Sequence, residues 1–149
     1  MNVGDRLELS ALVHRYAAAV DDRDIDAVLD LLTADAELVL PNPPDVLTPT
    51  RAHRGRDAIR AALDAVTGVG RTHHGVDSEV YRGGVEDHVA HGRIGGTAHH
   101  WSRQHDGITD LVWYLRYDDD YRRTETGWLI ARRTLTIDAI ETRSARRLR

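Results

Sequence analysis

The sequence predicts a single α+β domain in which three helices near the N-terminus are followed by a curved antiparallel β-sheet. Two observations indicate this class. Apolar residues recur at helical spacing up to about residue 66, and from residue 71 onward long strand-like segments alternate with glycine-containing turns. With 149 residues and 41% apolar content, we expect one domain over 1–149, with its core at about 7–140 and a basic tail at 141–149.

The first helix is predicted over about residues 4–20, where apolar side chains recur on one face. Asp24 is an expected N-cap of a second helix, and a third helix is expected between Gly55 and Gly68. The apolar residues of the first helix are Leu9, Leu12, Val13, Tyr16 and Val20.

Residues 36–40 predict a short strand, and the proline-rich segment 41–49 predicts a loop because proline cannot donate to a β-ladder. Gly95 and Gly96 interrupt one of the later strands, as a bulge or bend would, and long bent strands wrap around helices. Four long strands are predicted over 71–81, 88–102, 108–123 and 128–140, joined by turns at 82–87, 104–107 and 124–127.

The composition excludes several functions. Cysteine is absent, which excludes disulfides and thiolate chemistry, and lysine is absent, which excludes Schiff-base catalysis through a side-chain amine. No glycine-rich phosphate loop is present, so no cofactor is expected. The net charge of −4 predicts no nucleic-acid partner, and the lack of a long apolar run or signal-peptide core predicts a cytoplasmic chain without membrane contact.

Two adjacent histidine pairs, His73–His74 and His99–His100, lie inside predicted strands. Since neighbours on a strand point to opposite faces, one member of each pair should face the helices. Alternation groups His74 with Val76 and Val80, which favours it as the inward member. The glycines break the pattern before the second pair, so periodicity leaves its inward member open.

Each histidine has a plainer interpretation as a surface or interface residue. No metal site is expected, because adjacent residues on a strand cannot both ligate one ion and no H-x-H or H-E-x-x-H spacing occurs. Of four aspartates at the end of the first helix, Asp22 and Asp26 are expected to be charges in contact with solvent. Asp21 follows Val20 near the core-facing stripe that contains Tyr16, so its side chain can point toward a cavity under the sheet.

The segments "AAAVDDRDIDAVLDLLTADAELVL", "GRDAIRAAL", "RTHHGV", "DHVAHGR" and "GWLIARRTLTID" resemble the SnoaL-like members of the nuclear transport factor 2-like superfamily. The resemblance spans roughly residues 7–140 and implies a cone: a curved sheet rolled around the helices, with an apolar pocket open at one end. Scytalone dehydratase and bile-acid 7α-dehydratase resemble the chain most by motif.

The resemblance implies an active site. The spacing of Tyr16 and Asp21 and the Thr72-His73-His74 context match the dehydratases, which assigns Asp21 and His74 as a catalytic dyad. The spacing of a second active-site histidine falls on His99. Two positions depart from the pattern: Val20 stands where a pocket tyrosine would, and Tyr117 stands near the place of a polar asparagine. The predicted substrate-binding wall consists of Tyr16, Val20, Leu40, Trp113 and Tyr117.

The sequence therefore predicts a cofactor-independent acid–base enzyme. It would act as a dehydratase, isomerase or cyclase on a small, largely apolar carbonyl compound, polycyclic ones included. The alternative is a non-catalytic small-molecule-binding or assembly domain with the same cone, and a third is the small subunit of a ring-hydroxylating dioxygenase. The long exposed strand faces predict a homodimer or homotrimer that associates through the sheet.

Overall fold

The computed structural model describes all residues except 67, 69 and 84–87. Six strands form one sheet in the order β2-β1-β6-β5-β4-β3. In chain order the elements are α1 (Val3–Asp22), α2 (Ile25–Asp30), β1 (Leu32–Asn42), β2 (Val46–Arg54), α3 (Gly55–Val66), β3 (Arg71–Gly83), β4 (Val89–Gln104), β5 (Gly107–Thr124) and β6 (Gly127–Ala145).

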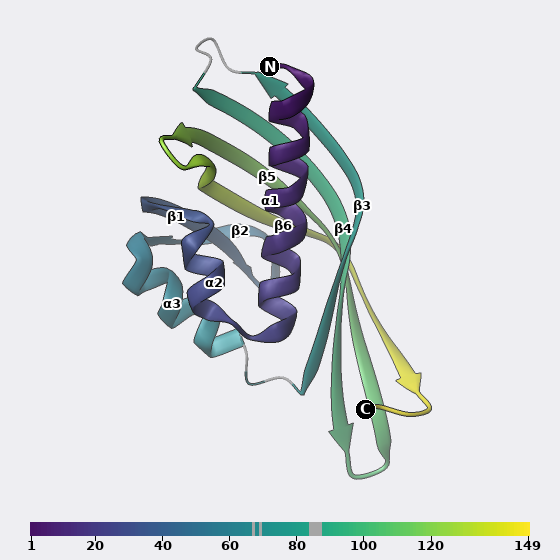
Figure 1. Cartoon of the computed structure of the whole chain (residues 1–149). Helices are drawn as coiled ribbons and strands as arrows, with labels where there is room; N and C mark the ends of the chain where they lie inside the picture. Colours follow the sequence, from purple (N-terminus) through teal and green to yellow (C-terminus); the bar gives the residue numbers. More distant parts are fainter. Residues whose placement is uncertain (67, 69, 84–87) are drawn as a thin grey trace.

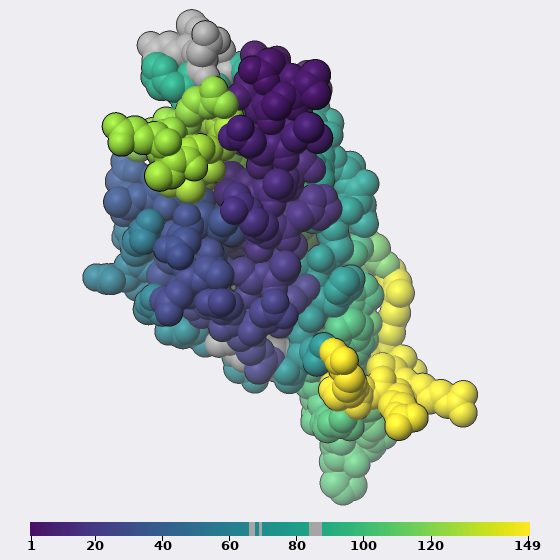
Figure 2. Space-filling view, in the orientation of Figure 1, coloured from purple at the N-terminus to yellow at the C-terminus, as the bar shows by residue number. Residues whose placement is uncertain are grey.

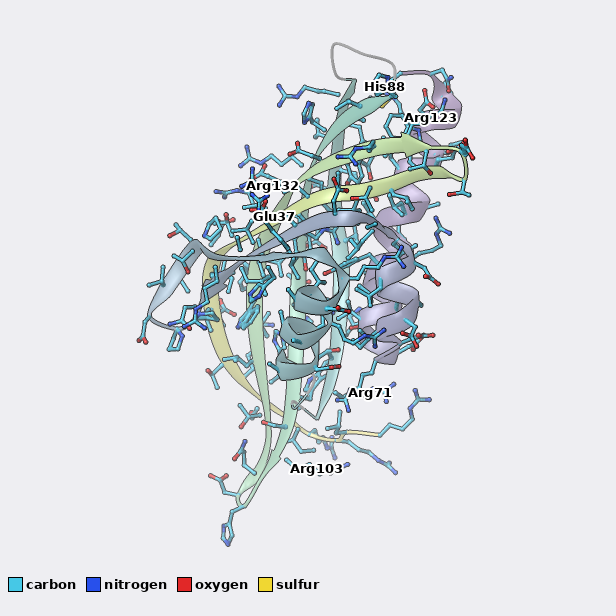
Figure 3. All side chains as sticks on the ribbon, turned by 90° about the vertical axis from the view of Figure 1, so that its left-hand side faces the viewer. Glu37, Arg71, His88, Arg103, Arg123 and Arg132 are labelled. Atoms are coloured by element: carbon cyan, nitrogen blue, oxygen red, sulfur yellow. The ribbon has the colours of Figure 1, made fainter. Side chains whose placement is uncertain are left out.

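The α+β class and the curved sheet are confirmed, but the sheet is mixed. β1 pairs in parallel with β6, with Glu37 opposite Arg132, while the other neighbouring strands pair antiparallel. Figure 3 shows Glu37 and Arg132 side by side, where an Arg132 nitrogen lies 3.9 Å from a Glu37 carboxylate oxygen. The parallel pair joins the first strand to the last, because β6 lies between β1 and β5.

Two predicted segments have other boundaries in the structure. The loop predicted at 41–49 is wrong, because β1 continues to Asn42 and β2 starts at Val46. β2 is an edge strand, where a proline costs no ladder hydrogen bond, so Pro49 is tolerated there. The tail predicted to begin at 141 begins later, since β6 continues to Ala145. The turn predicted at 82–87 falls largely outside the described residues.

The ends of α1 are fixed by its own sequence. The Asn2 side chain accepts a hydrogen bond from the Asp5 amide and the Asp5 carboxylate accepts one from the Asn2 amide, both at 2.9 Å, which forms a capping box. At the other end Arg23 adopts a left-handed conformation with φ of 59°. Asp24 then caps α2 by accepting from the Ala27 amide at 3.0 Å, as predicted. The helix therefore stops directly after Asp21 and Asp22.

Gly95 and Gly96 allow β4 to bend against β3. The register of the two strands shifts between Val76 and Ser78, opposite these glycines. A Cβ atom on Gly96 would lie only 2.3 Å from the Gly75 carbonyl oxygen, closer than any side chain tolerates. The predicted bend is therefore a close backbone contact between two strands, which only glycine permits.

All three helices lie on the concave face of the sheet (Figure 1). α1 contacts β3 and β6, while α3 contacts β1 and β2. The main core between helices and sheet includes Leu9, Leu12, Val28, Ile59 and Ile130, each no more than 1% exposed. Figure 2 shows the helices forming one broad surface, below which β4 and β5 project.

Candidate active site

The end of α1 holds Asp21 against the free edge of β3. Its carboxylate accepts three hydrogen bonds: from the His74 amide at 2.8 Å, from the Thr72 hydroxyl at 3.0 Å, and from the His74 ring at Nδ1, at 2.7 Å. The side chains of Asp21 and His74 are 19% and 16% exposed. The structure therefore brings the two residues of the predicted dyad together in a mostly buried place.

These contacts define the protonation of the pair. Burial, the largest single influence, favours the neutral carboxyl, but the hydrogen bonds from the ring and amide of His74 outweigh it. The pKa of Asp21 therefore lies below its ordinary value of 3.8. Because an ionised carboxylate only accepts hydrogen bonds, Nδ1 of His74 carries the proton. In the neutral ring Nε2 then has a free electron pair and can act as a base.

A second imidazole, His100, lies beside His74 with the two ring centres 6.2 Å apart. Its Nδ1 donates to the Leu111 carbonyl at 2.9 Å, which leaves Nε2 as an acceptor. Burial is the main cause that lowers the pKa of His100 below 6.5, and the nearby His74 adds to it, although the bond to Leu111 acts the other way. His100 is thus held in its neutral form.

The prediction that His99 lies in the pocket is wrong. In the β3–β4 register Thr72 faces His100 and His73 faces His99, so His99 lies on the outer face of the sheet with His73. There its Nδ1 lies 2.7 Å from the Asp110 carboxylate. Of the two alternatives that periodicity left open, His100 is the inward one.

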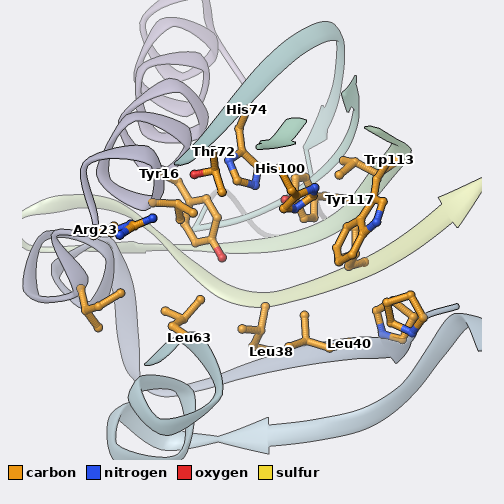
Figure 4. Close-up of a pocket in the computed structure, with 16 residues that line it drawn as sticks. Tyr16, Arg23, Leu38, Leu40, Leu63, Thr72, His74, His100, Trp113 and Tyr117 are labelled. Atoms are coloured by element: carbon orange, nitrogen blue, oxygen red, sulfur yellow. The ribbon is translucent and has the colours of Figure 1, made fainter. Parts of the chain in front are cut away.

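An apolar cavity of about 180 Å³ opens beside His74 and His100. Figure 4 shows the two imidazoles and Trp113 on one side, across from Leu38, Leu40 and Leu63. All five residues of the predicted wall border this cavity: Tyr16, Val20, Leu40, Trp113 and Tyr117. Sequence reasoning missed Leu38, Leu63 and Leu135, which also line it and carry only the pattern of ordinary core residues.

Arg133 supports the tyrosines of the wall from behind. Its guanidinium lies 4.0 Å from the ring centre of Tyr16 and 4.2 Å from that of Tyr117, and it forms two hydrogen bonds with Asp119 at 2.7 and 2.9 Å. Arg133 is 1% exposed. Burial is the first cause that raises the pKa of both Tyr16 and Tyr117, so both remain protonated hydroxyl groups. No sequence pattern had distinguished Arg133 from the other arginines.

Asp22 and Asp24 are exposed, and Asp26 pairs with Arg60. Asp21 does not line the cavity itself but holds His74, which does. Within the described parts of the chain, no group of three or more His, Asp or Glu side chains is arranged to hold a metal ion. Nor do these parts contain a helix with the length and apolarity to cross a membrane. The site consists of ionisable protein groups around an apolar hollow.

A curved sheet around helices, with an apolar hollow between them, is the α+β cone of the nuclear transport factor 2-like fold. The chain belongs to the SnoaL-like domain family, which matches residues 1–134. No curated protein matches it.

Solved structures from Novosphingobium aromaticivorans are similar to the chain. A candidate aromatic ring hydroxylase is 28% identical, with a TM-score of 0.80 and 96% of each chain covered. A candidate scytalone dehydratase is 19% identical, with a TM-score of 0.79, 97% of this chain and 91% of that chain covered. An NTF2-like protein with a cystatin-like fold is 24% identical, with a TM-score of 0.69, 91% of this chain and 83% of that chain covered. The last two likenesses concern the fold alone.

Proposed function

We propose that the protein is a cofactor-independent acid–base enzyme that removes a proton from carbon next to a carbonyl group of a small ringed compound. The observation that carries the proposal is the 2.7 Å contact between Asp21 and the Nδ1 atom of His74 at the wall of an apolar cavity. It leaves Nε2 of His74 as the base beside a mostly apolar wall.

In the proposed first step the substrate C–H bond breaks and its proton passes to Nε2 of His74. The imidazolium that forms is stabilised by the ionised Asp21 carboxylate, while the substrate becomes an enolate. Tyr16 and Tyr117 line the cavity and keep their hydroxyl protons, so they are suited to donate hydrogen bonds to the enolate oxygen. His100 accepts a hydrogen bond from a substrate hydroxyl.

In the second step His74 returns the proton. Delivery to a departing hydroxyl completes a dehydration, and delivery to another carbon completes an isomerisation or accompanies a cyclisation. A positioned group of this kind contributes about 10²–10⁴ in rate.

The size of the cavity supports a small substrate. A cavity of about 150 Å³ accommodates benzene, so about 180 Å³ suits one ring or a small fused pair, with larger substituents extending through the opening. The aromatic wall and the 28% identity to a candidate aromatic ring hydroxylase both support a flat, ringed compound.

The test follows proton abstraction without the natural substrate. 2-Tetralone, a bicyclic ketone, is incubated in D₂O, and NMR measures exchange of the hydrogens next to its carbonyl. The wild-type protein should accelerate this exchange by about 10²–10⁴ relative to His74→Ala. Equal exchange with both proteins would contradict the proposal.

One observation favours the second candidate, a non-catalytic binder. Asp21 also joins α1 to β3 through Thr72 and the His74 amide, as a purely structural clamp would. Binding of 2-tetralone, measured by calorimetry, without any accelerated exchange would support this alternative.

A further inference from the structure

The outer face of the sheet carries a second pair of histidines, with Asp110 beside one of them and Asp21, the carboxylate that also contacts His74, near the other. His73 on β3 and His99 on β4 are direct partners in the register, and their ring centres lie 6.3 Å apart. The side chains of His73 and His99 are 65% and 24% exposed. Sequence reasoning considered neighbours on one strand, whereas the fold brings together two histidines from different strands.

Each of these histidines has a carboxylate on its Nδ1 side. For His99 the partner is Asp110, at 2.7 Å, and for His73 it is Asp21, whose nearer oxygen lies 3.8 Å away. With Nδ1 directed to a carboxylate, Nε2 is left to bind a ligand. A carboxylate behind a metal-bound imidazole is the usual second layer of transition-metal sites, because it orients the ring and makes the nitrogen more basic.

Asp110 is a second, independent indication that a cation binds beside His99. It is 7% exposed, and its Oδ1 atom is buried without a hydrogen-bond partner among the described residues. Arg143, which faces Asp110 across β5 and β6, instead binds Glu141 through Nε at 3.1 Å and also contacts Tyr114. A buried carboxylate that is only partly satisfied is stabilised by an added positive charge next to its histidine.

We propose that His73 and His99 bind one divalent transition-metal ion through their Nε2 atoms, with Asp21 and Asp110 as the carboxylates behind them. Two protein nitrogens leave the remaining coordination positions to water or a small anion. Imidazole ligands suit Cu²⁺, Ni²⁺ and Zn²⁺ and do not suit Ca²⁺ or Mg²⁺.

The primary experiment titrates the full chain, without an affinity tag, with each of these ions in a calorimeter. One ion per chain is expected, with Cu²⁺ bound more tightly than Ni²⁺ or Zn²⁺ and no binding of Ca²⁺. His73→Ala and His99→Gln should each weaken Cu²⁺ binding at least tenfold. Gln keeps a donor for Asp110 but has no imidazole nitrogen, and Asp110→Asn should weaken binding about 10–100-fold.

His91 provides a matched control. Its Nδ1 lies 2.6 Å from Asp120 on the next strand, as His99 lies against Asp110, but its partner on β3 is Arg82. His91→Ala should therefore bind Cu²⁺ like the wild-type protein. His73 is mostly exposed, so His73→Ala keeps the fold, and unchanged Cu²⁺ binding in this variant would overturn the proposal. The proposal would also be overturned if His91→Ala lost as much Cu²⁺ affinity as His73→Ala and His99→Gln.

The fluorescence of Trp101 independently reports where the metal ion binds. Its ring stacks on His99 with 5.2 Å between ring centres and 14° between planes. Bound Cu²⁺ should quench its fluorescence, and Trp101→Phe should lose this quenching while calorimetry still records the same affinity. Quenching that persists fully in Trp101→Phe would place the ion elsewhere and contradict the proposal. The proposal does not depend on the function proposed for the pocket.

Discussion

The carboxylate of Asp21 and the imidazole of His74 lie 2.7 Å apart although 53 positions separate them in the chain. The contact forms because α1 ends at Arg23, directly after the carboxylate, and because β3 is an edge strand whose His74 amide points outward to meet it. The same carboxylate therefore fixes the backbone and the ring of one residue.

Asp21→Asn should remove the base while keeping the clamp. The asparagine oxygen can accept from the His74 amide, and its NH₂ group then donates to Nδ1 of His74, which moves the ring proton to Nε2. In Ser-His-Asp triads the corresponding wrong tautomer costs about 10⁴ in rate. We expect 2-tetralone exchange to fall by about 10²–10⁴, and ¹⁵N NMR of the imidazole should show the change of tautomer.

Thr72→Val is the control for that variant. It removes another hydrogen bond to Asp21 but leaves the tautomer of His74 unchanged. Its exchange rate should fall much less, and an equal fall in both variants would show that the tautomer is not the cause.

The stability of the protein should depend on Asp21 in acid. The pKa of this carboxyl is lowered on folding, so its contribution is fully present above the unfolded value of about 3.8 and is lost as the pH falls through the folded value. The melting temperature of the wild-type protein should exceed that of Asp21→Asn at pH 7. The gap should narrow below about pH 4 in thermal melts followed by circular dichroism; a gap that widened there would contradict the lowered pKa.

His100 and His99 should behave differently in the exchange assay. His100→Phe keeps a ring against Trp113 but removes the polar nitrogen from the cavity, so 2-tetralone exchange or binding should weaken. His99→Gln changes only the outer face and should leave the exchange rate as it is. The opposite ranking would restore the sequence-based assignment of His99.

The buried pair of Arg133 and Asp119 should contribute strongly to stability. Both side chains are almost fully buried, at 1% and 0% exposure, so Asp119→Asn leaves an uncompensated cation behind the cavity wall. Removing one partner of a buried ion pair costs about 3–5 kcal/mol. Urea unfolding should record this loss, whereas Asp138→Asn, which breaks an exposed pair with Arg116, should cost far less.

The helices, the four long strands and the contact between Asp21 and His74 could be predicted because local pattern and the family resemblance agreed there. Alternation failed beyond the bulge after Val76: Val80, predicted to share the inner face with His74, is 60% exposed. The inward member of the second histidine pair depended on how β4 bends at Gly95 and Gly96, which is a contact between strands and not a local preference. The homodimer or homotrimer stays a prediction.

Asp21 also has a consequence for the edge of the sheet. An edge strand normally offers its free amides to any passing chain, and such edges are sites of unwanted strand addition. Here the outward amide of His74 is already occupied by a carboxylate, and a negative charge stands where a foreign carbonyl would have to approach. We therefore expect Asp21, the residue proposed to orient the base, also to hinder strand addition to β3 at this point, so that its loss lowers solubility as well as the proposed activity.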